Sequence, residues 1–554
     1  MNSNVSRFVP FALTAALVLS LAGAGGPRFG GVARAQANAG GAQTAAAVVG
    51  DLGAALERVS ADSLRGHVSF LASDALEGRR TPSRGLDLAA EYVAAQFRRA
   101  GLEPAGDDGY FQTANWLTRG RTSEGFALRF DAPAGATEVG AEQASLTFEV
   151  MGRTFFSAGP NAVALERAPV FKVAFADAAA LAALRPEQLK GRVVVTEIPD
   201  FRREDRSLWR EALQARQAFL RRLEELGAAA VVSVERQTAA GTGGGTPRLI
   251  DPENRPAQTA PTPPGAGVPF ITAHGPRAAS FYDSLKPGAT ESHATLRLPA
   301  PGEQPVKVRN VVGLLRGSDP SLKDTYVILS AHYDHIGVLA SGEGDRVNNG
   351  ANDNGSGTAA VMEIASALSA LKTRPKRSVL FVAFFGEELG LLGSKYYGRH
   401  PVVPIEKTVA QVNLEQVGRT DDSEGPQIST AAVTGYDFSD VGETLRASGE
   451  RVGVRFYKHP RNSDAYFGRS DNQALADLGV PAHTLGVAFA FPDYHGAGDH
   501  WDKIDYDNMA RVVRAVGLTL LLVADNPRPP RWDEKNPKTA KYVEAWKRLQ
   551  EGRK

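Results

Sequence analysis

A histidine and an aspartate stand two residues apart at the end of an apolar run. Residues 326–331 are followed by His332, Tyr333 and Asp334. An imidazole can bind a metal ion while a nearby carboxylate fixes its tautomer, an arrangement that is frequent around metal sites. A single motif of this kind is weak evidence, so the neighbouring motifs decide whether it carries chemistry.

Two adjacent carboxylates, Glu387 and Glu388, follow another apolar run, residues 378–385. Buried carboxylates are costly unless a positive group holds them, and a metal ion is the natural partner. One carboxylate can bind the metal while the other handles protons. A solvated helix start explains the pair alone nearly as well.

Three further groups complete the pattern. Asp353 lies in the glycine-rich turn 349–357, where it could instead cap the following helix. Glu415 follows a third apolar run, and His495 follows Tyr494 in a glycine-rich loop. The carboxyl ends of parallel strands open onto one crevice, so we expect these side chains to converge. Two histidines and three carboxylates, one of them bridging, are enough for two zinc ions.

The elements that carry these residues alternate between strand and helix. Strands are predicted at 326–331, 378–385 and 409–414, and helices at 357–371 and 389–397. This alternation predicts an α/β fold with a doubly wound, mostly parallel sheet and helices on both faces.

Composition narrows the chemistry. The 63 Lys plus Arg nearly balance the 62 Asp plus Glu, and the formal net charge of +1 gives no global attraction to nucleic acid or anionic lipid. Cysteine is absent, which excludes disulfides, thiol nucleophiles and cysteine-ligated metals. Any metal must therefore be bound by His, Asp and Glu.

The first residues are typical of a secretory signal peptide. Arg7 precedes an apolar run, and the small residues around 33–37 offer a cleavage site. The run is shorter than the roughly 20 residues of a spanning helix. We therefore expect an extracytoplasmic chain, periplasmic or secreted, without stable membrane insertion.

Taken together, the motifs resemble the co-catalytic zinc exopeptidase family, which includes bacterial leucyl aminopeptidases, glutamate carboxypeptidase II and the transferrin receptor. Residues 310–524 carry five motifs in the family's order, and 69–79 is similar to the family's opening helices. The middle region, with Lys190–Val194, Gly227–Ala230 and Val268–Pro269, resembles the protease-associated domain that is often inserted there.

The resemblance implies a role for each candidate residue. His332 and Glu415 would bind one zinc ion, His495 and Glu388 the other, and Asp353 would bridge the two. The implied cofactor is two Zn²⁺ per chain.

Three more roles follow from the same resemblance. Glu387 matches the family's general base, which takes a proton from the attacking water. Asp334 matches the carboxylate behind His332, and Tyr494 matches a tyrosine that hydrogen-bonds the tetrahedral oxyanion. In many relatives the peptide bond after the Asp353 position is cis.

Some positions leave alternatives open. The aminopeptidases usually have Asp where Glu415 stands, so this ligand reaches one methylene further. His500 could replace His495 as a ligand, and His335 is close enough in sequence to support a ligand or the structure. The remaining histidines are expected to be surface or core residues: His67, His274, His293, His400, His459 and His483.

Six segments are predicted along the chain. They are a signal peptide (1–37), a flexible spacer (38–55), the N-terminal part of the peptidase domain (56–140), an inserted, smaller β-rich protease-associated domain (141–300), the zinc peptidase catalytic domain (301–525) and a C-terminal surface extension (526–554). Within them we expect a helical stretch at 62–102, strands at 145–150, 191–195 and 227–234, a helix at 206–226 and a long exposed loop at 238–267.

The function implied is that of a metallo-exopeptidase with peptide substrates, and specifically an aminopeptidase. A carboxypeptidase for acidic C-terminal residues would need an arginine cluster, for which Arg461 and Arg469 are candidates. A glutaminyl cyclase-like transferase would use one metal, and a non-catalytic binding protein would lack ligands. The sequence gives no indication of the oligomeric state.

Overall fold

The computed structural model describes residues 53–120, 125–131, 145–148, 156–157, 161–175, 177–198, 206–236, 248–254, 267–339 and 344–551. The predicted signal peptide and nearly all of the predicted spacer lie outside these residues. The last three spacer residues, 53–55, are helical rather than flexible. Among the described helices, none is both long and apolar enough to cross a bilayer.

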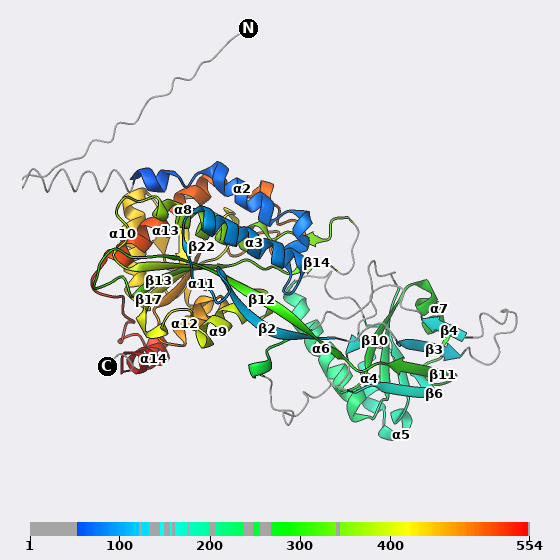
Figure 1. Cartoon of the computed structure of the whole chain (residues 1–554). Helices are drawn as coiled ribbons and strands as arrows, with labels where there is room; N and C mark the ends of the chain where they lie inside the picture. The colour runs from blue at the N-terminus through cyan, green and yellow to red at the C-terminus, as the bar shows by residue number, and fades with distance from the viewer. Residues whose placement is uncertain are drawn as a thin grey trace, which may run out of the picture. The chain divides into compact units, whose positions relative to one another are not determined.

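Ten strands form one large sheet (Figure 1). They are β1 (Glu103–Pro104), β2 (Phe111–Gly120), β9 (Arg248–Ile250), β12 (Gly302–Leu315), β13 (Tyr326–His332), β16 (Ser378–Phe384), β17 (Thr408–Leu414), β20 (Thr430–Val433), β21 (Arg455–Tyr457) and β22 (Ala482–Gly486). Their order is β21-β20-β22-β17-β13-β16-β12-β2-β9, and β1 pairs with β12.

The sheet is parallel at its centre and again at its β20–β21 edge. Strand β13 pairs in parallel with β16 and β17, and β17 pairs in parallel with β22. Strand β12 is antiparallel to both β16 and β2, and β20 is antiparallel to β22. The prediction of a mostly parallel sheet is therefore wrong for the sheet as a whole, because the strand–helix alternation on which it depended covers only the central strands.

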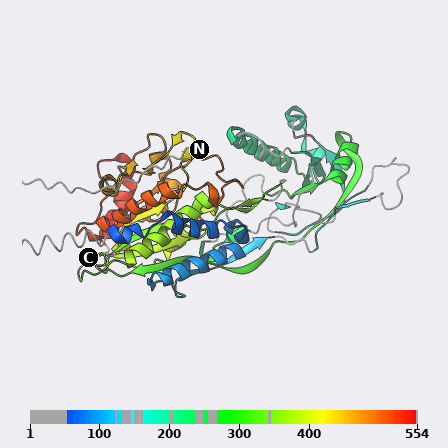
Figure 2. The same cartoon turned by 90° about the horizontal axis from the view of Figure 1, so that it is seen from above.

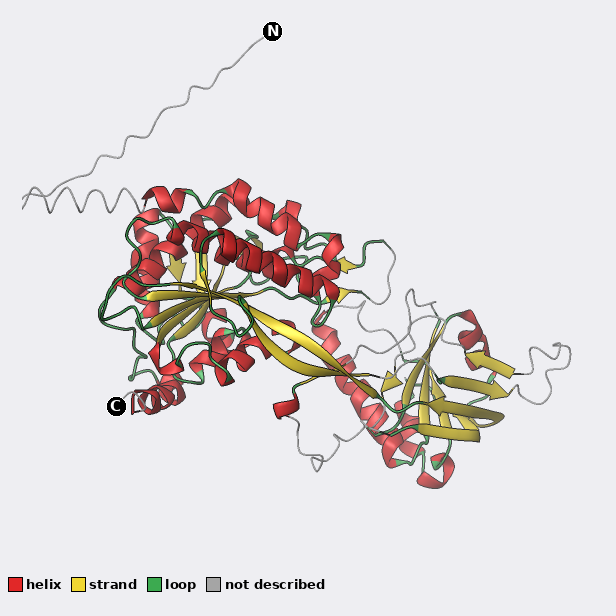
Figure 3. Ribbon diagram, in the orientation of Figure 1, coloured by secondary structure: helices red, strands yellow, loops and turns green. Residues whose placement is uncertain are grey.

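Helices cover both faces of this sheet (Figures 1 and 3). On one face lie α2 (Ala61–Leu71), α3 (Arg84–Arg99), α8 (Gly357–Ser369) and α13 (Tyr506–Asp525), with α10 (Val441–Val452) packed on α13. On the other lie α9 (Leu392–Arg399), α12 (Asn472–Ala476) and α14 (Ala540–Glu551). Figure 2 shows the blue helices of the N-terminal region beside the orange α13.

The expected helical stretch at 62–102 consists of two α-helices rather than one. A short helical turn, Asp74–Arg79, separates α2 from α3. Glu77, Gly78 and Arg79 have positive φ angles of 48°, 65° and 48°, which an α-helix cannot accommodate. Helix α3 then begins anew, because the Ser83 hydroxyl accepts a hydrogen bond from the Leu86 N–H.

Eight strands form a second sheet. In the sequence, these strands lie between β2 and β12 of the main sheet. They are β3 (Ala127–Asp131), β4 (Ser145–Phe148), β5 (Phe156–Ser157), β6 (Val163–Lys172), β7 (Val193–Thr196), β8 (Ala230–Glu235), β10 (Phe270–His274) and β11 (Gly288–Leu298). Helices α4 (Ala178–Ala183), α5 (Pro186–Leu189), α6 (Arg206–Glu225) and α7 (Pro276–Ser284) accompany them. The second sheet has an apolar core of its own.

Two features differ from the predicted boundaries of this region. Strand β3 belongs to the second sheet although it precedes residue 141. Strand β9 lies within the predicted loop 238–267, but it pairs with β2 of the main sheet. The residues of that loop on both sides of 248–254, up to 266, lie outside the described residues.

The C-terminal segment is part of the core rather than a surface extension. Trp532 and Tyr542 are 4% and 5% exposed, and their rings stack with centroids 5.0 Å apart. The Trp532 Nε1–H also donates to the Gly479 carbonyl at 2.9 Å. The many charged residues of the segment had indicated a surface position, but these two aromatic side chains bury it against the core.

Candidate metal centre

Neighbouring strand ends carry the candidate residues. His332 is the last residue of β13, Glu415 follows β17, and Glu388 stands four residues after the end of β16. Because β16, β13 and β17 are adjacent and parallel, their carboxyl ends open at the same edge of the sheet. Asp353 lies in the turn before α8, and His495 lies in the loop after β22.

We call His332, Asp353 and Glu415 the first cluster. Their ligand atoms all lie within 4.8 Å of one another, and all three residues are buried. The His332 Nε2 atom is 3.1 Å from Glu415 Oε1 and 3.5 Å from Asp353 Oδ1. The longer Glu415 side chain therefore reaches the histidine, and the Ser470 hydroxyl donates to its other oxygen at 2.8 Å.

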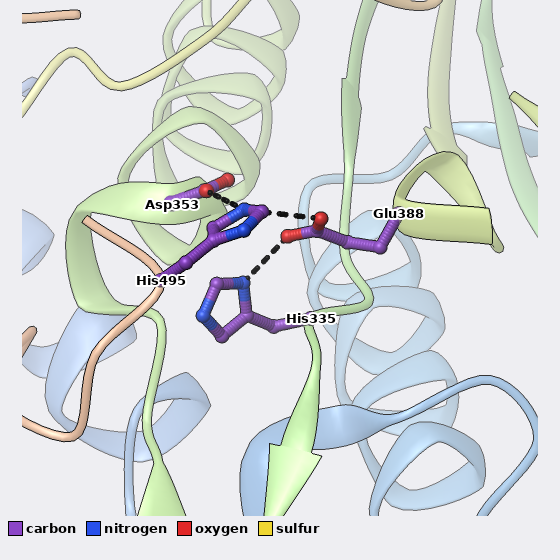
Figure 4. A group of neighbouring side chains, drawn as sticks. All are labelled: His335, Asp353, Glu388 and His495. Atoms are coloured by element: carbon purple, nitrogen blue, oxygen red, sulfur yellow. Dashed lines mark hydrogen bonds and ion pairs between the residues drawn. The ribbon is translucent and has the colours of Figure 1, made fainter. Parts of the chain in front are cut away.

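We call His335, Asp353, Glu388 and His495 the second cluster (Figure 4). The His495 Nε2 atom is 3.1 Å from Asp353 Oδ2 and 3.1 Å from Glu388 Oε2. The His335 Nδ1 atom is 2.8 Å from Glu388 Oε1. Asp353 thus presents one oxygen to each cluster, and His335 contacts the carboxylate that pairs with His495.

Asp334 and Glu387 lie directly beside the first cluster. Glu387 Oε2 is 3.9 Å from His332 Nε2. The Asp334 carboxylate accepts the Glu387 N–H at 3.1 Å and the Thr81 hydroxyl at 3.1 Å. Asp334 Oδ1 is also 3.5 Å from His332 Nδ1, so this one carboxylate connects the end of β13 to the turn after β16.

Tyr494 packs against the second cluster. Its ring stacks on the His495 ring with centroids 4.0 Å apart, and it lines a cavity of about 130 Å³ next to both clusters. Burial raises the pKa of Tyr494 well above its usual value, and nearby carboxylates such as Asp353 raise that pKa further. The phenol therefore keeps its proton and can act as a hydrogen-bond donor.

The turn that carries Asp353 is held by Asp499. The Asp499 carboxylate accepts the N–H groups of Asn352 and Asp353, each at 3.0 Å or less. Because Asp499 is four residues from His495, the same loop fixes both sides of the second cluster. The peptide bond between Asp353 and Asn354 is cis, which confirms what the resemblance implied.

Arg79 is a fully buried cation beneath the site that the sequence reasoning did not single out. It donates to the carbonyls of Tyr333, Asn349 and Gly350 at 2.8, 2.6 and 3.0 Å. Burial lowers the pKa of Arg79 to about 10, against the raising effect of nearby acids, so it stays charged at neutral pH. The only sequence signal for it was its place in the 69–79 motif.

Arg419 was also missed, and it fixes the His495 loop. Its side chain is 4% exposed and lies 3.0 Å from the Asp493 carboxylate, which is also 2.9 Å from the Lys503 ammonium. Asp493 stands two residues before His495. The Arg419 guanidinium also lies over the Phe491 ring, 5.2 Å from its centroid.

The site gathers several buried carboxylates, which a positive charge would stabilise. Burial raises the pKa of Glu387 well above its usual range, and the neighbouring carboxylates add to this, while His332 lowers it. Burial lowers the pKa of His495, but its bonds to Asp353 and Glu388 outweigh this and raise it to about 10. Several carboxylates sharing one buried site, with imidazole nitrogens among them, fit a pair of divalent cations such as zinc.

The alternative histidines are occupied elsewhere. His500 lies 3.1 Å from Asp345 and belongs to neither cluster. His67 pairs with Glu363 at 2.9 Å inside the helical layer. The remaining described histidine contacts are likewise away from the clusters: His400 with Glu253, His459 with Glu424 and His483 with Ser439.

The segment that holds both clusters is similar to a known peptidase family. Residues 310–520 match the model of Peptidase family M28. Aminopeptidase YwaD of Bacillus subtilis is 28% identical over 264 residues, which cover 45% of this chain and 50% of that protein. A probable zinc metalloprotease of Pyricularia oryzae is 31% identical over 209 residues, which cover 36% of this chain and 39% of that protein. The matches thus span half or less of the length of these relatives.

A solved structure shares the fold. The structure of BSAP, a zinc aminopeptidase from Bacillus subtilis, has a TM-score of 0.52 at 17% identity and covers 88% of this chain and 98% of that chain. The shared architecture is a mixed α/β fold with a large mixed sheet. All eight predicted site residues lie between 310 and 520, so the part of the chain that builds the candidate metal centre is the part that is similar to Peptidase family M28.

Proposed function

We propose that this protein is a di-zinc metallo-aminopeptidase that removes N-terminal residues from peptides. The observation that carries the proposal is the pair of clusters that share Asp353, next to a cavity that Glu387 and Tyr494 also line. The printed names of the relatives, an aminopeptidase and a probable zinc metalloprotease, agree with it.

The donor set would hold two zinc ions. His332 and Glu415 would bind one, His495 and Glu388 the other, and Asp353 would bridge them through its two oxygens. When bound, the ions act as Lewis acids that polarise the scissile carbonyl and lower the pKa of water toward neutrality. His335 would hold the Glu388 carboxylate in place through its 2.8 Å contact.

Glu387 is the proposed general base. It lines the cavity and is held by the bond from its own N–H to Asp334. A buried carboxylate with a raised pKa can accept a proton from water and return it to the departing amine. Tyr494, which lines the same cavity, would donate a hydrogen bond from its hydroxyl to the oxyanion that forms on the attacked carbonyl.

The alternatives have less support. A carboxypeptidase of the acidic type needs a cluster of arginines, but Arg461 is 74% exposed and paired with Glu424 at 2.6 Å. Arg469 is the one arginine that lines the cavity among the described residues. Two complete clusters argue against a single-metal cyclase and against a binding protein that has lost its ligands.

Further proposals concern the rest of the chain, its location and its partners. The second sheet, with its separate core, would be an inserted domain of the protease-associated type, and 526–554 would complete the peptidase domain. The signal-like residues 1–37 support an extracytoplasmic location. Peptides are the proposed substrates, and the small net charge of +1 gives no reason to expect nucleic acid.

The test combines metal content with amine dependence. The zinc-loaded full chain should contain two zinc ions and cleave unblocked aminoacyl peptides, but not N-acetylated ones. In Glu387→Ala we expect near-normal zinc content and turnover lowered by about 10²–10⁴-fold, the usual contribution of general base catalysis. Retained activity in this variant, or cleavage of blocked peptides at the C-terminus, would contradict the proposal.

A further inference from the structure

We propose that the cavity beside the two clusters selects peptides whose first residue has an acidic side chain, and that Arg469 recognises that side chain. The inference rests on the proposed aminopeptidase function and names its substrate class. The cavity measures about 130 Å³. Since pockets for drug-sized ligands run from roughly 300 to 1,000 Å³, this one suits a single amino-acid side chain.

Part of the cavity lining lies directly beside the first cluster. Gln416 follows Glu415 directly, and Ser470, which follows Arg469, donates to the Glu415 carboxylate at 2.8 Å. Gln416, Arg469 and Ser470 all line the cavity. With its scissile bond at the clusters, a substrate would have its first side chain against these residues.

Charge singles out Arg469 in the lining. Two divalent cations would balance the four carboxylates that line the cavity, and the exposed Arg469 guanidinium is the remaining charged side chain of the described lining. Among the described residues, no carboxylate forms an ion pair with Arg469. The guanidinium lies over the Tyr466 ring, 4.6 Å from its centroid, so stacking holds it in place. Arginine in this setting is suited to a planar carboxylate.

A buried amide provides a second polar group. Gln416 is 5% exposed, and its Oε1 atom has no hydrogen-bond partner among the described residues. Its φ angle of 53° is left-handed, a strained conformation that persists only where the surroundings fix it. The amide offers both a donor and an acceptor, which a half-turn of its last torsion exchanges. A polar substrate group would supply the partner that the protein does not.

The rest of the lining fits the length of a glutamate side chain. The Thr434 hydroxyl accepts the Thr484 N–H at 3.1 Å, which leaves its own proton available to donate. The rings of Tyr466 and Phe489, 5.9 Å apart, provide an apolar surface for the aliphatic stem. Leucine would leave the amide of Gln416 without a partner, and lysine would be repelled by Arg469.

The experiment compares first residues on one reporter. The p-nitroanilides of Glu, Gln, Leu and Lys are hydrolysed by the zinc-loaded full chain, and kcat/KM is measured for each. We expect Glu to be the best substrate and Lys the poorest. In Arg469→Gln, kcat/KM for Glu should fall about tenfold to a hundredfold relative to Leu, as for a charged hydrogen bond. Arg461→Gln, eight residues away and already paired with Glu424, is the matched control and should leave the ranking unchanged.

A second measurement tests the inference without the Arg469 variant, in case that variant folds poorly. Free glutamate should inhibit Leu p-nitroanilide hydrolysis by the unaltered protein at least about tenfold more strongly than free leucine. Two results would overturn the inference and leave the aminopeptidase proposal intact. One is a higher kcat/KM for Leu than for Glu. The other is a ratio of the Glu and Leu kcat/KM values that is the same in the unaltered chain and in Arg469→Gln. Failure to cleave any of the four anilides would overturn both.

Discussion

The first and second clusters are built from different kinds of structure. The first has His332 on the last residue of a central strand, and the side chain is 0% exposed. The second depends on His495, whose side chain is 32% exposed and whose φ of 54° lies in the left-handed region of a loop. One cluster is fixed by the sheet itself, whereas the other is fixed by contacts between loops. We therefore expect a tighter first site and a second site that depends on its supporting residues.

The largest effect should come from removing the strand histidine. His332→Ala leaves buried carboxylates of Glu415 and Asp353 without their imidazole partner, which costs both metal binding and stability. Loss of a supporting contact already lowers metal affinity about tenfold to a hundredfold, so loss of this ligand should exceed that range. Zinc titration with a competing chelator would measure it.

The same substitution at the loop histidine sharpens the comparison. His495→Ala should remove the second zinc ion and retain the first, and it should lower the thermal midpoint less than His332→Ala, because the side chain is partly exposed. Metal analysis after dialysis and a thermal melt test this. Equal losses of both ions in the two variants would show that the clusters do not differ as the structure indicates.

A smaller effect is expected from the residues that hold the loop. Asp493→Asn weakens the contacts to Arg419 and Lys503 but touches neither cluster. The second zinc should bind about tenfold to a hundredfold more weakly, with the first unchanged. Asp502→Asn, in the same loop region, is the control. An unchanged affinity of the second cluster for zinc in Asp493→Asn would show that Asp493 does not support this cluster.

The smallest effect concerns a buried histidine without carboxylates. His483 is fully buried, and burial lowers its pKa from 6.5 to about 4, although the Thr434 carbonyl partly opposes this. The unfolded chain therefore binds a proton between pH 6.5 and 4 that the folded chain does not, so stability is lost as the pH falls through this window. From pH 7.5 to 5 the loss is about 2 kcal/mol.

Urea unfolding at pH 7.5 and pH 5 tests this contribution. His483→Asn should be less stable at pH 7.5 but should lose less stability between the two pH values than the unaltered chain. His459→Asn, whose imidazole is 11% exposed and paired with the Glu424 carboxylate, is the control. An equal pH dependence in the unaltered chain and in His483→Asn would contradict the assignment of a neutral buried imidazole.

Local sequence patterns predicted the positions that the strand ends determine. Residues 332, 387, 388 and 415 follow three apolar runs, and the parallel centre of the sheet brings these three runs side by side. The antiparallel strands β12, β2 and β9 were not predicted, because their pairing joins segments far apart in sequence. The C-terminal segment was misjudged for a related reason, since Trp532 and Tyr542 bury only against distant elements.

The supporting residues of the site could not be read in the same way. Arg79 contacts the carbonyls of Asn349 and Gly350, about 270 residues later, and Arg419 contacts Asp493, 74 residues later. A lone arginine in a sequence does not differ from the many that lie on surfaces. Only the fold shows that these two are buried next to the clusters.

The most direct measurement of the central claim is anomalous diffraction at the zinc edge from crystals of the zinc-loaded full chain. The account predicts two peaks on either side of the Asp353 carboxylate, one next to His332 and Glu415 and the other next to His495 and Glu388. A single peak, or peaks away from Asp353, would contradict it.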